Sequence, residues 1–187
     1  MIEDDFKKQI KHSKRRTESI SENSNKEAIK LDDNDGLAKF LDFPSSMLSK
    51  VDYFVKKEHQ IQLIELTDLE EKVKDCFNTL NNLLKIAEEK KGEPLTTAEE
   101  RAIKKEVCMC EFKLKWYGSI AVVERLYRKN NITNINPQYQ LLIVCKNQTD
   151  IRMLEVLKRR LVGMMGVVDI CRTKDIILIT EPCDGIS

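Results

Sequence analysis

Two long amphipathic stretches constrain the fold of this chain more than any other feature. Apolar residues recur at alternating spacings of three and four between residues 66 and 87, and again between residues 103 and 121. This spacing places an apolar stripe along one side of an α-helix. Gly92 interrupts the pattern, and a short turn joins the two stretches. The sequence therefore predicts an antiparallel helical hairpin over residues 67–129.

The ends of these two helices carry their own signals. Lys90 and Lys91 stand just before Gly92, as expected where cations face the carboxyl end of a helix and glycine stops it. The segment Thr97–Glu100 fits a capping box that opens the second helix. Both signals favour two separate helices over one long helix.

A different period precedes the first helix. Residues 51–55 and 61–67 are rich in β-branched and aromatic residues, and a polar loop separates them. This pattern predicts two strands that pair as an antiparallel hairpin. A short helix before them is expected from the apolar residues of segment 36–43, which Pro44 ends.

The last third of the chain predicts a βαβ unit. Residues 139–145 form a nearly continuous apolar run, as in a strand buried on both faces. An amphipathic helix follows from residue 151, and apolar segments 167–171 and 176–179 indicate further strands. The expected fold class is α/β, or α+β, with a small mixed sheet and the long helical hairpin.

The first 35 residues contain little that a core could bury. They predict a mobile charged arm ahead of a single domain over residues 36–187. The arm is either a solvated tail, or a segment that contacts phosphates or docks on a partner. Its candidate phosphate-binding residues are the basic ones, Lys7, Lys8, Lys11, Lys14, Arg15 and Arg16.

Charge restricts the kinds of partner. Lys plus Arg number 32 and Asp plus Glu number 31, so a uniformly basic nucleic-acid binder is excluded and any such surface is a local patch. A second basic cluster surrounds the last predicted helix. It is either a solvated face or a site for a phosphate backbone, and it comprises Lys146, Arg152, Lys158, Arg159 and Arg160.

The six cysteines lie among apolar residues and far from both histidines, which favours reduced, packed thiols over disulfides or a zinc site. No apolar run approaches the roughly 20 residues of a membrane-spanning helix. The amino-terminal residues are acidic and lack the order of a secretory signal. These features predict a cytoplasmic protein with no membrane contact.

Two acids in the predicted β-hairpin are the best candidates for chemistry. Asp52 and Glu65 lie on neighbouring strands, and Thr67 shares the face of Glu65 because side chains alternate along a strand. An acid within an apolar strand costs free energy unless it is paired, binds a metal or lies at an edge. Two such carboxylates suit Mg²⁺, which prefers oxygen ligands.

Over roughly residues 37–180, the chain resembles the PD-(D/E)XK nuclease superfamily. The family pattern is an acid at the end of one strand, an apolar strand that closes in Glu-x-Lys, a helix, and a later strand–helix–strand unit. Asp52 matches the first acid, and the segment 64–67 matches the second motif. The resemblance implies that Asp52 and Glu65 bind a metal ion. It also implies metal-dependent phosphodiester hydrolysis, or nucleic-acid binding, with a lysine that orients or activates the attacking water.

The chain departs from the family pattern at the lysine. Thr67 occupies that position and supplies no cation, so activity requires a migrated lysine such as Lys50 or Lys56, or is absent. Two long helices also replace one. The alternative for this segment is an ordinary strand end, with Thr67 or Asp68 capping the next helix.

The rival function is a non-catalytic interaction subunit of a larger complex, which docks through the helical hairpin and the N-terminal arm. Both long helices carry apolar residues away from their main stripes, and these form a second apolar surface on each helix. The part that does not cover the sheet is expected to bind a protein partner or a second copy. The residues concerned are Phe77, Leu84, Ile86, Phe112, Ile120, Val122 and Val123.

Overall fold

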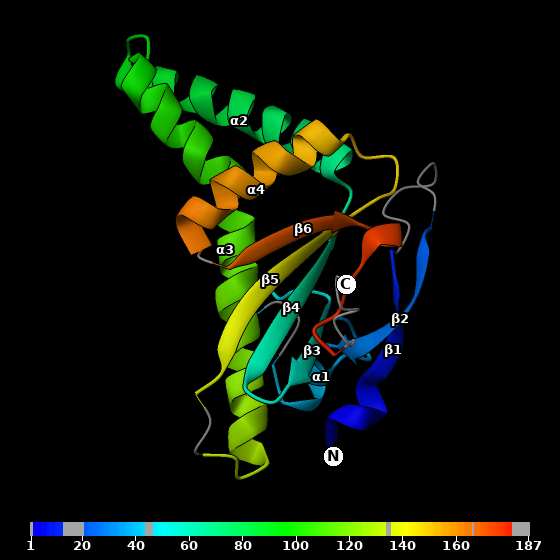
Figure 1. Ribbon diagram of the computed structural model, residues 1–187. Coiled ribbons are helices and arrows are strands. Elements are labelled where there is room, and N and C mark those ends of the chain that lie inside the picture. Colours follow the sequence, from blue (N-terminus) through cyan, green and yellow to red (C-terminus); the bar gives the residue numbers. More distant parts are fainter. Residues whose placement is uncertain (1, 13–20, 44–46, 134–135, 166, 181–187) are drawn as a thin grey trace.

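The computed structural model describes residues 2–12, 21–43, 47–133, 136–165 and 167–180. Six strands form one mixed sheet in the order of the chain (Figure 1). The first four strands pair antiparallel, and the last three pair parallel. The strands are β1 (Lys7–Lys11), β2 (Asn23–Lys30), β3 (Tyr53–Lys57), β4 (Gln60–Thr67), β5 (Gln138–Cys145) and β6 (Val168–Arg172).

Helices connect the parallel strands. Both α2 and α3 lie between β4 and β5, and α4 lies between β5 and β6. Two short 3-10 helices, η1 (Ile2–Phe6) and η2 (Thr173–Asp175), flank the described part of the sheet in sequence. The α-helices are α1 (Leu37–Phe40), α2 (Leu69–Lys91), α3 (Thr97–Lys129) and α4 (Ile151–Met165).

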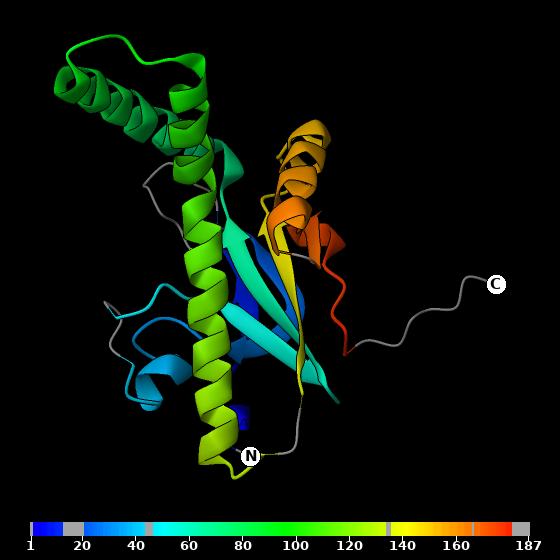
Figure 2. The ribbon, with the colours of Figure 1, turned by 90° about the vertical axis from the view of Figure 1, so that its left-hand side faces the viewer.

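The two faces of the sheet are covered differently. One face contacts α1, α3 and α4 through a large cluster that includes Leu63, Ile143, Val123 and Leu161. The other face packs against the carboxyl-terminal segment through Ile64, Val144 and Leu178, among others. Figure 2 shows α3 running along the sheet, while α2 leaves the body as the outer arm of the hairpin.

The mixed α/β fold and the helical hairpin are confirmed. Asp68 caps α2, where its carboxylate accepts a hydrogen bond from the Glu71 amide, and Gly92 ends that helix with a φ of 75°. Thr96 and Glu99 form a capping box at α3, one residue earlier than expected. These local signals are readable because each depends on only a few neighbouring residues.

The amino-terminal segment differs from the predicted mobile arm. Its described residues form η1 and two strands of the sheet, and residues 13–20 lie outside the described part. Backbone pairing with β2 supports β1, although only Ile10 of that strand is buried. Pairing of this kind does not require an apolar sequence, which is why the composition does not indicate it.

Two further expectations need correction. Segment 176–179 is not a strand; it follows η2 as irregular chain that buries Ile176 and Leu178 against the sheet. The predicted stripe of α3 is also misplaced, because Leu114 and Tyr117 are exposed. The buried side of α3 instead carries Phe112, Ser119, Val122, Val123 and Leu126, because this helix packs mainly on the sheet.

Candidate functional site

The β3–β4 hairpin places Asp52 beside Glu65. Tyr53 is paired with Ile64, so the next position in the antiparallel register sets Asp52 opposite Glu65. Asp52 Oδ2 accepts a hydrogen bond of 2.8 Å from the Leu66 amide, which fixes the carboxylate at the end of β4. The sequence prediction that brings these two acids together therefore agrees with the register of the hairpin.

Helix α3 fixes the chain that leads into Asp52. The Val51 amide donates a 2.9 Å hydrogen bond to Ser119 Oγ, and that hydroxyl donates to the Lys115 carbonyl. Gly118 allows this close approach, since a Cβ there would lie 2.1 Å from the Ser49 carbonyl oxygen. The start of β3 is thus held against the helix.

Glu65 lies at the buried end of a chain of charged side chains. Its side chain is 0% exposed, and Lys115 Nζ lies 2.5 Å from Glu65 Oε1. Glu111 lies 3.7 Å from Lys115 and also 2.7 Å from Lys72 Nζ. The two lysines come from different helices, Lys72 from α2 and Lys115 from α3. Lys115 pairs with Glu65 of the sheet, whereas Lys72 pairs with Glu111 of α3.

Burial and charge shift the pKa values of this pair. Burial, and next the negative charge of Asp52, raise the pKa of Glu65 to about 8. Burial opposes the ammonium form of Lys115, yet the charges of Glu65 and Asp52 raise its pKa above the usual value. Lys115 is therefore a cation held among acids.

Two polar atoms at this site have no hydrogen-bond partner among the described residues. They are Glu65 Oε2 and Thr67 Oγ1, and both are buried. A buried carboxylate oxygen without a donor is costly, and a cation is one way to satisfy it. Mg²⁺ commonly binds one or two carboxylates and keeps several waters, so Asp52 and Glu65 fit it. Within the described ranges, no group of three metal-ligating side chains occurs.

A polar cavity of about 160 Å³ opens beside Asp52. Lys11, His12, Asp68 and Lys146 are among the residues that line it. Lys146 Nζ lies 2.5 Å from Asp68 Oδ2. Although burial opposes the charged form of Asp68, the hydrogen bond from Lys146 lowers the pKa of this carboxyl. The cavity gives Asp52 a polar approach, whereas Glu65 is not among its lining residues.

The structure separates the predicted site residues into two groups. Asp52, Glu65 and Thr67 lie together at the ends of β3 and β4. Lys56 does not join them: it is four residues farther along β3, or about 13 Å, and forms an ion pair with Glu3. Lys50 bonds the Leu48 carbonyl and lies 3.3 Å from Asp32.

The predicted basic residues are likewise dispersed. Lys11 and Lys146 line the cavity beside Asp52. Lys7 pairs with Glu27, and Lys8 is exposed on β1. On or next to α4, ion pairs join Arg152 with Asp150, Arg159 with Glu155 and Lys158 with Asp169, while Arg160 is exposed. Lys14, Arg15 and Arg16 lie outside the described residues.

Sequence reasoning missed Lys115, together with its neighbours Lys72 and Glu111. One signal points to Lys115: it stands between Phe112 and Ser119 at helical spacing, in the middle of the buried side of α3. A charged residue within an apolar stripe indicates a buried partner. This signal can be recognised only when the buried side of α3 has been identified correctly.

The other sequence expectations concern thiols and membranes. Among the cysteines whose side chains the structure describes, Cys76, Cys110, Cys145 and Cys171 are free of disulfides. In the described part of the chain, no helix combines the length and the apolar character needed to cross a membrane.

Comparison with models of known protein families, with curated proteins and with known structures gives no match to this chain. The geometry of the site is therefore the basis for assigning a function to this chain.

Proposed function

We propose that this protein is a nuclease-like protein in which Asp52 and Glu65 hold a divalent cation, Mg²⁺ by preference, beside a phosphodiester. The main support for the proposal is that the β3–β4 hairpin sets these two acids opposite each other and that the ammonium of Lys115 contacts Glu65. The resemblance to the PD-(D/E)XK superfamily supports it through the order of strands and helices. Bound there, such a cation would lower the pKa of a water molecule and stabilise charge on the phosphate.

Lys115 supplies the positive charge that the lysine of the family pattern would supply and that Thr67, at the same position, does not. Its ammonium reaches Glu65 from α3 and not from β4, so the cation is supplied by a different element of the fold. The ammonium orients Glu65 and places positive charge where the attacking water and a phosphate oxygen would lie. Lys115 therefore replaces the migrated Lys50 or Lys56 as the proposed catalytic lysine.

The polar cavity beside Asp52 provides the approach for nucleic acid. Lys11 is exposed and lines the cavity, and Lys146 forms its buried wall. Cations placed around a scissile phosphate position the backbone without reading its sequence. The exposed Lys11 is the feature that favours this cavity, because Lys146 is paired with Asp68 and most of the described basic side chains on or next to α4 are also paired with acids.

Cleavage assays with Mg²⁺ or Mn²⁺ on DNA and RNA test the proposal. We expect cleavage by the purified protein, and a loss of at least about a hundredfold in Asp52→Asn or Glu65→Gln, because metal-assisted stabilisation is worth several kcal/mol. Glu70→Gln removes an exposed acid from the first turn of α2 and is the matched control. Circular dichroism checks that each variant folds.

Cleavage that survives in both Asp52→Asn and Glu65→Gln would contradict the assignment of these acids. A folded wild-type protein that cleaves no substrate with either metal ion would contradict the catalytic part of the proposal.

A second prediction concerns the salt dependence of nucleic-acid binding. Lys11→Gln is expected to reduce the slope of log affinity against log salt by about 0.9, the value for one phosphate contact on duplex DNA. Lys8→Gln, on the same strand but not lining the cavity, is the matched control and is expected to leave the slope unchanged. Equal slopes for both variants and the wild type would remove Lys11 from the interface.

A non-catalytic interaction subunit is the second candidate function. Exposed apolar side chains on the helical hairpin favour it, notably Phe77, Ile86 and Tyr117. Phe112, Val122 and Val123 do not contribute, because they are buried in the main core cluster. We propose that, in this case, the outer part of the hairpin binds a protein partner or a second copy.

A further inference from the structure

One carboxylate oxygen lies between two ammonium groups where α2 meets α3. Glu111 Oε1 is 2.7 Å from Lys72 Nζ of α2 and 3.7 Å from Lys115 Nζ of α3. Glu111 and Lys115 are four residues apart on the same helix, a spacing at which an acid and a lysine commonly form an ion pair. Glu111 therefore competes with Glu65 for the ammonium of Lys115.

Lys115 contacts one of these two acids at hydrogen-bond distance. Its Nζ lies 2.5 Å from Glu65 Oε1 but 3.7 Å from Glu111 Oε1. A hydrogen bond from an ammonium group to a carboxylate spans about 2.7–2.9 Å, so the longer contact is an ion pair without a hydrogen bond. The Glu111 side chain is 46% exposed, whereas that of Glu65 is 0% exposed. The contact with Glu65 thus draws the lysine into the fold, and a closer contact with Glu111 would draw it toward solvent.

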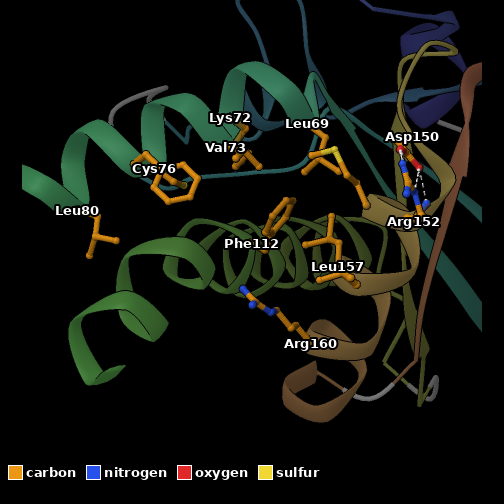
Figure 3. A pocket seen from close by; sticks show the side chains of 13 residues that line it. Leu69, Lys72, Val73, Cys76, Leu80, Phe112, Asp150, Arg152, Leu157 and Arg160 are labelled. Carbon is orange, nitrogen blue, oxygen red and sulfur yellow. Dashed lines mark hydrogen bonds and ion pairs between the residues drawn. The ribbon is translucent and has the colours of Figure 1, made fainter. Parts of the chain in front are cut away.

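Lys72 has a restricted position beside Glu111. Its side chain is 8% exposed and lies on the α2 wall of a groove of about 550 Å³ that residues of α2, α3 and α4 line (Figure 3). Its ammonium is 4.2 Å from the centre of the Phe112 ring, whose face attracts a cation. Phe112 directly follows Glu111 on α3, so two adjacent residues of that helix contact Lys72. These contacts keep the ammonium of Lys72 at Glu111.

The burial of Lys72 indicates that its charge has a role. Lysine is rarely buried unless it is paired, because its ammonium group loses water. Leu69 and Leu80, which are also buried on α2, are apolar, and an apolar side chain at position 72 would pack there without this cost. The lysine instead places a positive charge at a point of α2 from which it reaches Glu111.

We infer that Lys72 is a positioning residue for Lys115: its ion pair with Glu111 neutralises this acid and leaves Lys115 in contact with Glu65. This role rests on the proposed function, in which Lys115 is the catalytic lysine. Without the Lys72 ammonium, the full attraction of Glu111 acts on Lys115. Lys115 then exchanges a fully buried partner for a half-exposed one, beside which water still solvates its charge.

Nuclear magnetic resonance of the full-length protein, with lysine labelled with ¹³C at Cε, follows Lys115 without any substrate or metal ion. The spectrum of Lys115→Arg assigns its signal. We expect Glu65→Gln to shift this signal in the wild-type background, because Glu65 is the acid that Lys115 contacts. In the Lys72→Met background we expect Glu111→Gln to shift the signal and Glu65→Gln to leave it unchanged.

Cleavage with Mg²⁺ measures the consequence for activity. Lys72→Met keeps an unbranched side chain against Phe112, and the half-exposed Glu111 tolerates the loss of its partner. We expect this variant to cleave at least about tenfold more slowly, and added Glu111→Gln to restore the rate to within about twofold, because a small displacement of a catalytic group is costly. Glu70→Gln, added instead, changes the net charge equally on an exposed side chain and is expected to restore nothing. Lys74→Met, at an exposed position of α2, is expected to cleave like the wild type.

Two results would overturn this role of Lys72. One is a Lys115 signal that responds to Glu65→Gln alike in the wild-type and Lys72→Met backgrounds. The other is a loss of cleavage in Lys72→Met that Glu70→Gln restores as well as Glu111→Gln does, since net charge alone would then explain it. If the Lys115 signal responds as expected and the wild type cleaves no substrate, Lys72 still positions Lys115, and only the proposed phosphodiester chemistry is contradicted.

Discussion

Replacing Val123 with glutamate is expected to destabilise the folded protein by at least about 3 kcal/mol, because the new carboxylate would be buried without a partner. Val123 is 0% exposed in the cluster between α3 and the sheet. The sequence left open whether this residue faces the sheet or a partner protein. The packing of α3 places it on the sheet, so the substitution acts on the stability of the monomer.

Urea unfolding followed by circular dichroism measures this effect as a shift of the midpoint. Leu114→Glu is the matched control, because Leu114 is on the same helix and is 53% exposed. The free energy of unfolding of the Leu114→Glu variant is expected to stay within about 0.5 kcal/mol of the wild-type value. An unchanged midpoint for Val123→Glu would mean that α3 does not pack on the sheet through this side.

Removing the cation of the buried Lys115–Glu65 pair is expected to lower the free energy of unfolding by a similar amount. Lys115→Met leaves Glu65 buried without its partner, and breaking such a pair typically costs about 3–5 kcal/mol. Adding Glu65→Gln to this variant is expected to restore much of the loss, because the remaining group no longer carries a charge. Lys85→Met, an exposed position on α2, serves as the control.

The contribution of the Lys115–Glu65 pair to the stability of the folded protein depends on pH. Burial and the charge of Asp52 raise the pKa of Glu65 to about 8, above its ordinary value of 4.5. Between these two values the folded protein retains a proton that the unfolded chain releases, so stability falls as pH rises through this window and is level above it. Glu65→Gln is expected to remove this decline.

Unfolding experiments at pH 5 and pH 8.5 measure the difference. Lys115→Met is expected to lose more stability at pH 8.5, where Glu65 is ionised, than at pH 5, where Glu65 is neutral. An identical loss at both pH values, together with an unchanged pH profile for Glu65→Gln, would contradict the charge assignment of this pair.

The acids of the candidate site were predictable from the sequence, and the cation was not. Asp52 and Glu65 belong to two strands joined by a short loop, so local periodicity and an antiparallel hairpin bring them together. Lys115 is fifty residues beyond Glu65. Its arrival at Glu65 depends on how α3 crosses the sheet, which no local pattern specifies.

The amino-terminal strands also depend on tertiary structure and not on a local sequence pattern. Their composition is polar, and only a few side chains such as Ile10 and Ala28 are buried. A strand at the edge of a sheet is stabilised by backbone hydrogen bonds to its neighbour, and these bonds do not depend on side-chain type. The sequence therefore indicated an arm where the tertiary structure adds two strands.

By itself, the sequence determined the strands of the hairpin, the end of α2 at Gly92, the start of α3 to within one residue, and the helix between β5 and β6. Each of these follows from interactions within a few residues, such as period, caps and turns. Only the tertiary structure decided which side of α3 is buried, which lysine reaches Glu65, and that α2 and α4 leave an apolar groove between them. The physical reason is that an amphipathic helix specifies a buried stripe but not its partner, and the partner is chosen by packing between segments far apart in the chain.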